Sequence, residues 1–70
     1  MTALEMFKEL GFKYKSYRSD FAYENDMGNK IKFIYFNLST HMYCTNVYHV
    51  EMKLQKAINQ QLKELGWLDE

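Results

Sequence analysis

The stretch from Lys30 to Leu38, KIKFIYFNL, constrains the fold most, because it is the longest strand-like run and carries apolar residues on both faces. Successive side chains of a strand point to opposite sides of the sheet. The two faces carry Ile31, Phe33 and Tyr35 on one side and Ile34, Phe36 and Leu38 on the other. Two apolar faces are typical of a central strand that is covered on both sides. We therefore expect the rest of the chain to pack around this stretch.

The length of 70 residues predicts a single small domain spanning residues 1–70. A chain this short buries only about 60% of the surface that its unfolded form exposes. We therefore expect a thin margin of stability, for which self-association is a common remedy. Cys44 is the single cysteine, which excludes a disulfide within the chain.

The first twenty residues mix charged side chains into the apolar positions and form no signal-peptide core. The chain also contains no run of about 18 apolar residues, so no membrane-spanning helix is predicted. We expect a cytoplasmic location. The net charge of zero argues against a general electrostatic attraction to nucleic acid, although it leaves room for a local basic patch.

Two segments have helical patterns with marked ends. Thr2 followed by Glu5 is a capping-box pair, and it predicts a helix from about residue 3 to residue 10 that Gly11 terminates. The second helix is expected to begin between His49 and Met52, without an obvious cap, and to end before Gly66. The stripes at helical spacing are Ala3, Met6, Phe7 and Leu10 in the first helix and Leu54, Ala57, Ile58, Gln61, Leu62 and Leu65 in the second.

The middle of the chain favours strands. We predict strands at residues 21–24, 30–38 and 41–48, with a hairpin turn at residues 25–29 in which Gly28 has a positive φ. Residues 13–20 are irregular and are interpreted as a connector that can begin a first strand. The expected fold class is α+β, in the order helix, three-stranded antiparallel meander, helix, with both helices mainly on one sheet face.

The two helix ends resemble those of short uncharacterised proteins encoded by phages and prophages of Gram-positive bacteria. The shared residues are Thr2, Ala3, Glu5, Phe7, Leu10, Gly11 and Phe12 at the front and Lys56, Ala57, Ile58, Asn59, Gln61, Glu64, Leu65, Gly66 and Trp67 at the back. The resemblance covers roughly a third of the chain, and the family has no assigned activity from which site residues could be carried over. It implies a phage or prophage accessory protein in the cytoplasm of a bacterial host.

No pattern of side chains predicts catalysis, a metal site or a cofactor. His41 and Cys44 are three residues apart in a predicted strand, so they should point to opposite faces, and we expect Cys44 to be a buried structural residue. Asp20, Glu24 and Asp26 lack the further ligands of a calcium loop. An enzyme is therefore not expected.

The segment from residue 13 to residue 18 interleaves cations with aromatic rings, which is typical of proteins that bind single-stranded nucleic acid. The candidate contact residues are Lys13, Tyr14, Lys15, Tyr17 and Arg18. Acidic residues nearby weaken the basic character of the segment. The alternative interpretation is a solvated connector whose tyrosines pack on the helices.

A sheet covered by helices on one side leaves its other face open for a protein partner or a second copy of the chain. The residues predicted for this interface are Phe21, Tyr23, Ile31, Phe33, Tyr35 and Tyr43, which are odd-numbered positions of the strands. Helices that straddle the sheet would instead bury both faces. The favoured function is thus a non-enzymatic protein that binds a protein partner or itself, and the alternative is a nucleic-acid-binding module.

Overall fold

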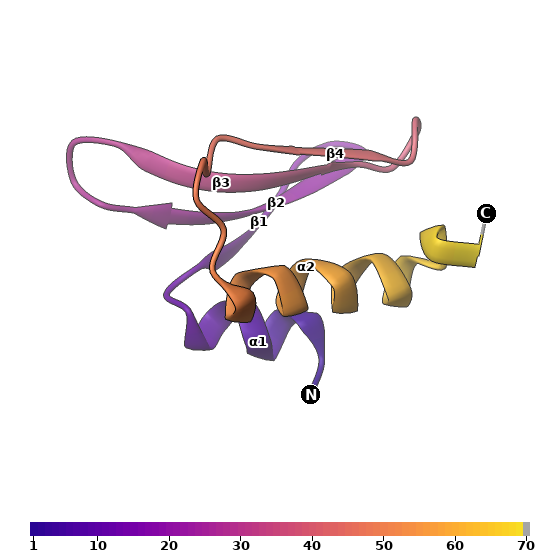
Figure 1. The fold of residues 1–70 in the computed structure, drawn as a ribbon. Helices are drawn as coiled ribbons and strands as arrows, with labels where there is room; N and C mark the ends of the chain where they lie inside the picture. Colours follow the sequence, from indigo (N-terminus) through magenta and orange to yellow (C-terminus); the bar gives the residue numbers. More distant parts are fainter. Residues whose placement is uncertain (70) are drawn as a thin grey trace.

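An antiparallel sheet forms one layer of the molecule, and two helices lie side by side beneath it (Figure 1). The computed structural model describes residues 1–69. The strands are β1 (Lys13–Ser16), β2 (Asp20–Asp26), β3 (Ile31–Asn37) and β4 (Met42–Thr45), in the sheet order β1-β2-β3-β4. The helices are α1 (Ala3–Glu9) and α2 (Met52–Leu65), and a 3-10 turn, η1 (Trp67–Asp69), follows α2.

The α+β class is confirmed, but the sheet has four strands where three were predicted. The additional strand is β1, which pairs antiparallel with β2 from Lys13 opposite Glu24 to Ser16 opposite Phe21. Its residues lay in the predicted connector. All four residues are exposed, so β1 does not alternate between buried and exposed positions, and its sequence carries no such pattern. The strand predicted at residues 41–48 is shorter, and Leu38 lies beyond β3 and is exposed.

The predicted start of the first helix and the predicted end of the second are confirmed, whereas α1 ends at Glu9, one residue earlier than predicted. Thr2 and Glu5 form a reciprocal capping box at the start of α1, in which each side chain bonds the backbone amide of the other residue. At the end of α2, Gly66 has a left-handed backbone with a φ of 76°, and its amide bonds the carbonyls of the last turn. Glu51 precedes α2 without a side-chain cap, as its sequence indicates.

Short turns fix which side chains share a sheet face. Arg18 and Ser19 form the turn between β1 and β2, and Gly28 and Asn29 form the turn between β2 and β3. Gly28 has the predicted positive φ, 92°. Because each turn contains an even number of residues, an odd-numbered residue of one strand pairs with an even-numbered residue of the next. Even-numbered residues therefore face the helices in β1 and β3, and odd-numbered residues face them in β2 and β4.

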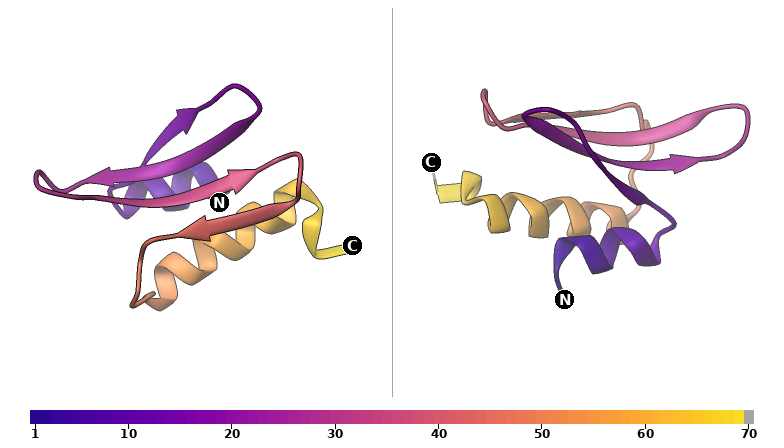
Figure 2. Two further views of the ribbon diagram at one scale, coloured as in Figure 1. Left: turned by 90° about the horizontal axis from the view of Figure 1, so that it is seen from above. Right: turned by 180° about the vertical axis from the view of Figure 1, so that it is seen from behind.

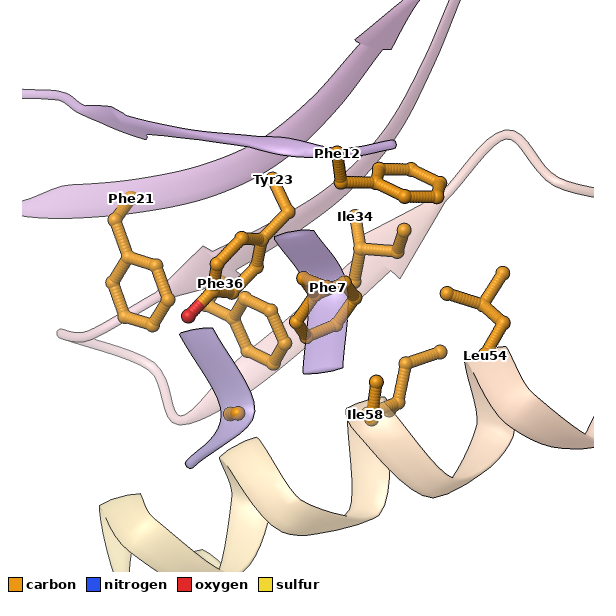
Figure 3. Packing of buried hydrophobic residues seen from close by; sticks show 10 residues of the cluster. Phe7, Phe12, Phe21, Tyr23, Ile34, Phe36, Leu54 and Ile58 are labelled. Carbon is orange, nitrogen blue, oxygen red and sulfur yellow. The ribbon is translucent and has the colours of Figure 1, made fainter. Parts of the chain in front are cut away.

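The core lies between the sheet and the helices (Figure 3). Ile34 and Phe36 of β3 point toward the helices and are fully buried, so this is the face of β3 that the helices cover. Tyr23 stacks on Phe7 of α1, with ring centroids 3.9 Å apart, and Phe21 stacks on Phe36 at 5.0 Å. The buried apolar cluster comprises Ala3, Phe7, Phe12, Phe21, Tyr23, Ile34, Phe36, Leu54, Ala57 and Ile58. Within residues 1–69, no helix has the length and apolar character needed to cross a membrane.

Candidate interaction surface

Within residues 1–69, the sheet face turned away from the helices has no other layer above it, as the side and rear views show (Figures 1 and 2). We call it the open face. Alternation along each strand and the pairing between strands assign its members. They are Lys13 and Lys15 of β1, Asp20, Ala22, Glu24 and Asp26 of β2, Ile31, Phe33, Tyr35 and Asn37 of β3, and Met42 and Cys44 of β4.

The open face is divided by chemistry. The strands β1 and β2 present charged side chains, two lysines beside three carboxylates. The strands β3 and β4 present an apolar half, which we define as Ile31, Phe33, Tyr35, Met42 and Cys44. Ile31 is 46% exposed and Met42 is 65% exposed, while Phe33 and Tyr35 are half-buried. The apolar half thus offers surface that the chain itself does not cover.

Two tyrosines cross the middle of the open face. The Tyr17 hydroxyl donates a hydrogen bond of 2.5 Å to Oε2 of Glu24, and the Tyr35 hydroxyl donates one to Oδ2 of Asp20. Their ring centroids lie 6.1 Å apart. Ala22 lies between Asp20 and Glu24 on the open face, directly opposite Tyr35, and is only 1% exposed.

These two hydrogen bonds also raise the pKa of each tyrosine above its ordinary value of 10. The bond to Glu24 is the main cause of the raised pKa of Tyr17, and the bond to Asp20 is the main cause for Tyr35. A phenolate could not donate a hydrogen bond to a carboxylate, so the neutral form is favoured. Both hydroxyls consequently stay protonated at neutral pH and keep the rings in place.

The six residues predicted for the interface do not share one face, so that prediction is wrong in this respect. Ile31, Phe33 and Tyr35 lie on the open face as expected. The other three lie on the helix side: Phe21 and Tyr23 are buried in the core, and the Tyr43 ring packs 5.7 Å from Phe36. The prediction grouped odd-numbered positions across strands, whereas the even-length turns invert the parity. Counting turn residues would have replaced these three with Met42 and Cys44.

The residues of the nucleic-acid hypothesis are also divided between the two faces. Lys13 and Lys15 are exposed on the open face, and Arg18 is exposed in the turn between β1 and β2. Tyr14 lies on the helix side, where its ring is 5.5 Å from Phe21. Tyr17 is on the open face, but its hydroxyl is bound to Glu24. The interleaved cations and rings of this segment therefore do not form one continuous surface.

His41 lies in the turn before β4, with a φ of 58°, and not in the strand that was predicted to contain both His41 and Cys44. His41 stacks on Trp67 at 5.1 Å, on the helix side, whereas Cys44 lies on the open face. Cys44 is exposed, so the expectation of a buried cysteine is wrong, because β4 is an edge strand with no layer above it. In the part of the chain that the structure describes, no cluster of three or more His, Cys, Asp or Glu residues could hold a metal ion.

Comparisons with protein-family models, curated proteins and solved structures found no match to this chain. Its geometry and chemistry are therefore the basis on which a function can be assigned.

Proposed function

We propose that this protein is a small, non-enzymatic binding protein that contacts another protein through the apolar half of its open face. The observation that supports the proposal is the placement of both helices on one side of the sheet (Figure 1). That placement leaves Ile31 and Met42 exposed and Phe33 half-buried on the other side. Contiguous exposed apolar surface is typical of sites that bind proteins.

The arrangement of the open face matches the anatomy of protein interfaces. Aromatic residues are enriched at the centre of such interfaces, and charged residues are depleted there. Phe33 and Tyr35 occupy β3, an interior strand, and Met42 and Cys44 continue the apolar surface to the sheet edge. The charged side chains of β1 and β2 lie to one side, where they would form a polar rim. A partner with an apolar contact surface bordered by charges would fit this face.

The cellular setting is part of the same proposal. The resemblance of both helix ends to short phage and prophage proteins supports an accessory protein that acts in the cytoplasm of a bacterial host. An accessory protein of this size would work by occupying a surface of a larger partner. The open face supplies such a contact surface without requiring catalysis.

A capture experiment tests the proposal. The wild-type protein, a Phe33→Glu variant and a Met52→Glu variant would be immobilised and exposed to lysate of the source organism. Met52 is exposed at the start of α2, outside the open face, so its variant is a control for added charge. We expect the wild type and the control to retain the same partner and the Phe33→Glu variant to lose it. Equal capture by all three proteins would reject the open face as the binding surface.

A second candidate function, binding of single-stranded nucleic acid, is favoured by one observation. Lys13 and Lys15 project from the same face that carries Phe33 and Tyr35, and cations beside aromatic rings on a sheet suit stacked bases and phosphates. The carboxylates of β2 lie between the lysines and the rings and would repel the phosphates. Protein binding is therefore the better-supported function.

Fluorescence anisotropy with a labelled single-stranded oligonucleotide separates the two functions. The Lys13→Ala, Lys15→Ala, Arg18→Ala variant would be compared with a matched Lys53→Ala, Lys56→Ala, Lys63→Ala variant of α2. Salt-sensitive binding that only the first variant loses would favour nucleic acid. Absence of binding at low salt would reject this candidate.

A further inference from the structure

The sheet has two edge strands, and each has a paired neighbour on one side only. The order β1-β2-β3-β4 places β1 at one edge and β4 at the other. An edge strand presents unpaired backbone N–H and C=O groups that can pair with another strand. Proteins commonly protect such edges with charged side chains, with proline or with a covering segment.

The two edges of this sheet are protected very differently. β1 reads KYKS, and Lys13 and Lys15 place positive charge along it. β4 reads MYCT and contains neither a charged residue nor a proline. Met42 is 65% exposed and Tyr43 is 42% exposed, so the side chains of β4 are accessible on both sheet faces. A hollow of about 310 Å³ opens beside Met42, Tyr43 and Cys44.

The flank of the helix layer next to β4 is uncharged as well. Seen from above, α2 runs alongside β4, and α1 lies on the other side of α2, toward β1 and β2 (Figure 2). Glu64 marks the α1 side of α2, because its carboxylate accepts a hydrogen bond of 2.7 Å from the amide of Ala3. At 100° per residue, Gln55 and Leu62 lie on the opposite flank of α2, next to the β4 edge. Both side chains are uncharged.

We propose that β4 pairs antiparallel with β4 of a second copy of this chain, joining the two sheets into one continuous sheet. In a register centred on Tyr43, the Tyr43 residues of the two copies are opposite each other, and Met42 of each copy is opposite Cys44 of the other, so that opposed side chains share a sheet face. No charged residues oppose one another in this pairing. The same operation at the β1 edge would bring the lysines of two copies together, which is destabilising.

The symmetry of strand pairing and the exposed side chains of β4 favour a second copy of this chain as the partner at this edge. In a two-fold dimer the same strand lies on both sides of the axis. The unpaired N–H groups of each β4 therefore face the unpaired C=O groups of the other. The flanks of α2 that carry Gln55 and Leu62 approach each other on the same side. Pairing would cover Met42 and Tyr43, and it would add intermolecular burial to a chain whose own core is small. The pairing uses the sheet edge and does not depend on the proposed binding function of the open face.

Light scattering after size-exclusion chromatography tests the proposal at high micromolar protein concentration. We expect the wild type to have twice the single-chain mass of 8.5 kDa. Tyr43→Lys places a charge on β4 outside the apolar half of the open face, and this variant should have the mass of one chain. Ser16→Lys is the matched change on the β1 edge and should leave the dimer intact.

Two further measurements make the outcome decisive. Phe33→Glu should remain dimeric, because it changes the open face and leaves the edge untouched. A monomeric Phe33→Glu protein would assign the dimer to the open face and overturn the proposal.

Circular dichroism checks the fold of each variant, and Met42→Lys replaces Tyr43→Lys if the latter does not fold. Amides of β4 should also exchange hydrogen more slowly as protein concentration rises. A monomeric wild type, or a dimer that persists in the folded β4 variant, would overturn the proposal.

Discussion

The Tyr23 hydroxyl donates a hydrogen bond of 2.5 Å to Oε1 of Gln61, which connects β2 to α2 inside the core. Both side chains are buried, with exposed fractions of 2% and 7%. A buried polar atom needs a partner, because leaving it unpaired costs the full loss of its hydration. The two residues therefore depend on each other, and this dependence leads to the first two predictions.

Tyr23→Phe should destabilise the protein by about 1–3 kcal/mol, because Oε1 of Gln61 is left buried without a donor. Adding Gln61→Leu should recover part of this loss, since replacing both partners by apolar groups can be nearly neutral. Urea denaturation of the two single variants and the double variant measures the coupling. Strictly additive losses would show that the hydrogen bond does not link the two sites.

Alkaline pH should destabilise the protein through Tyr23. Burial, followed by the negative charge of Glu64, raises the pKa of Tyr23 to about 12. Below pH 10 the phenol is protonated in both the folded and unfolded states, so its ionisation does not lower the free energy of unfolding. Above pH 10 the unfolded chain releases the proton first, so the free energy of unfolding falls by about 1 kcal/mol at pH 11. The Tyr23→Phe variant should show a smaller decrease in denaturation experiments across this range.

Neighbouring substitutions on β3 should differ sharply in their effect. Ile34 is fully buried against the helices, so Ile34→Glu would place an unpaired carboxylate in the core and should prevent folding. Phe33 lies on the open face, and Phe33→Glu should leave the protein folded, with a cost of less than about 2 kcal/mol. Far-ultraviolet circular dichroism and thermal unfolding compare the two variants. The reverse order of stability would mean that the helices cover the other face.

Gly66→Ala should lower the free energy of unfolding by about 1 kcal/mol, because Gly66 has a left-handed backbone that alanine disfavours. A Cβ atom at this position would contact nothing within 4 Å, so the cost comes from the backbone alone. Gly66→Asn should be milder, since asparagine tolerates this conformation better. Thermal unfolding of both variants measures the difference. Equal stability of Gly66→Ala and the wild type would contradict the role of this residue in ending α2.

The features that the sequence predicted well are local ones. Thr2 and Glu5 are three residues apart and interact within one helical turn, and Gly66 ends α2 through its own backbone. The apolar stripe of α2 follows directly from helical periodicity, and Leu54 and Ile58 are buried as expected. None of these features requires knowledge of a distant part of the chain.

The features that the sequence did not predict depend on pairing between strands. The exposed strand β1 exists because β2 offers it an edge, which no pattern within Lys13–Ser16 reveals. The composition of the open face depends on the length of each turn, since one residue more or less would exchange the faces of the next strand. Tyr43 was placed on the wrong face for this reason. The Tyr17 and Tyr35 hydrogen bonds depend on this pairing too.

The hydrogen bond between the amide of Ala3 and Glu64 joins residues 61 positions apart, whereas every strand pairs with the strand next to it in sequence. Contacts between sequence neighbours form quickly because they close short loops, and contacts between the two ends of a chain form late. We therefore expect the meander to assemble early and the pairing of α1 with α2 to be the final step of folding. In folding kinetics, changes at Ala3 or Glu64 should mainly accelerate unfolding, and changes in the hairpin of β2 and β3 should mainly slow folding.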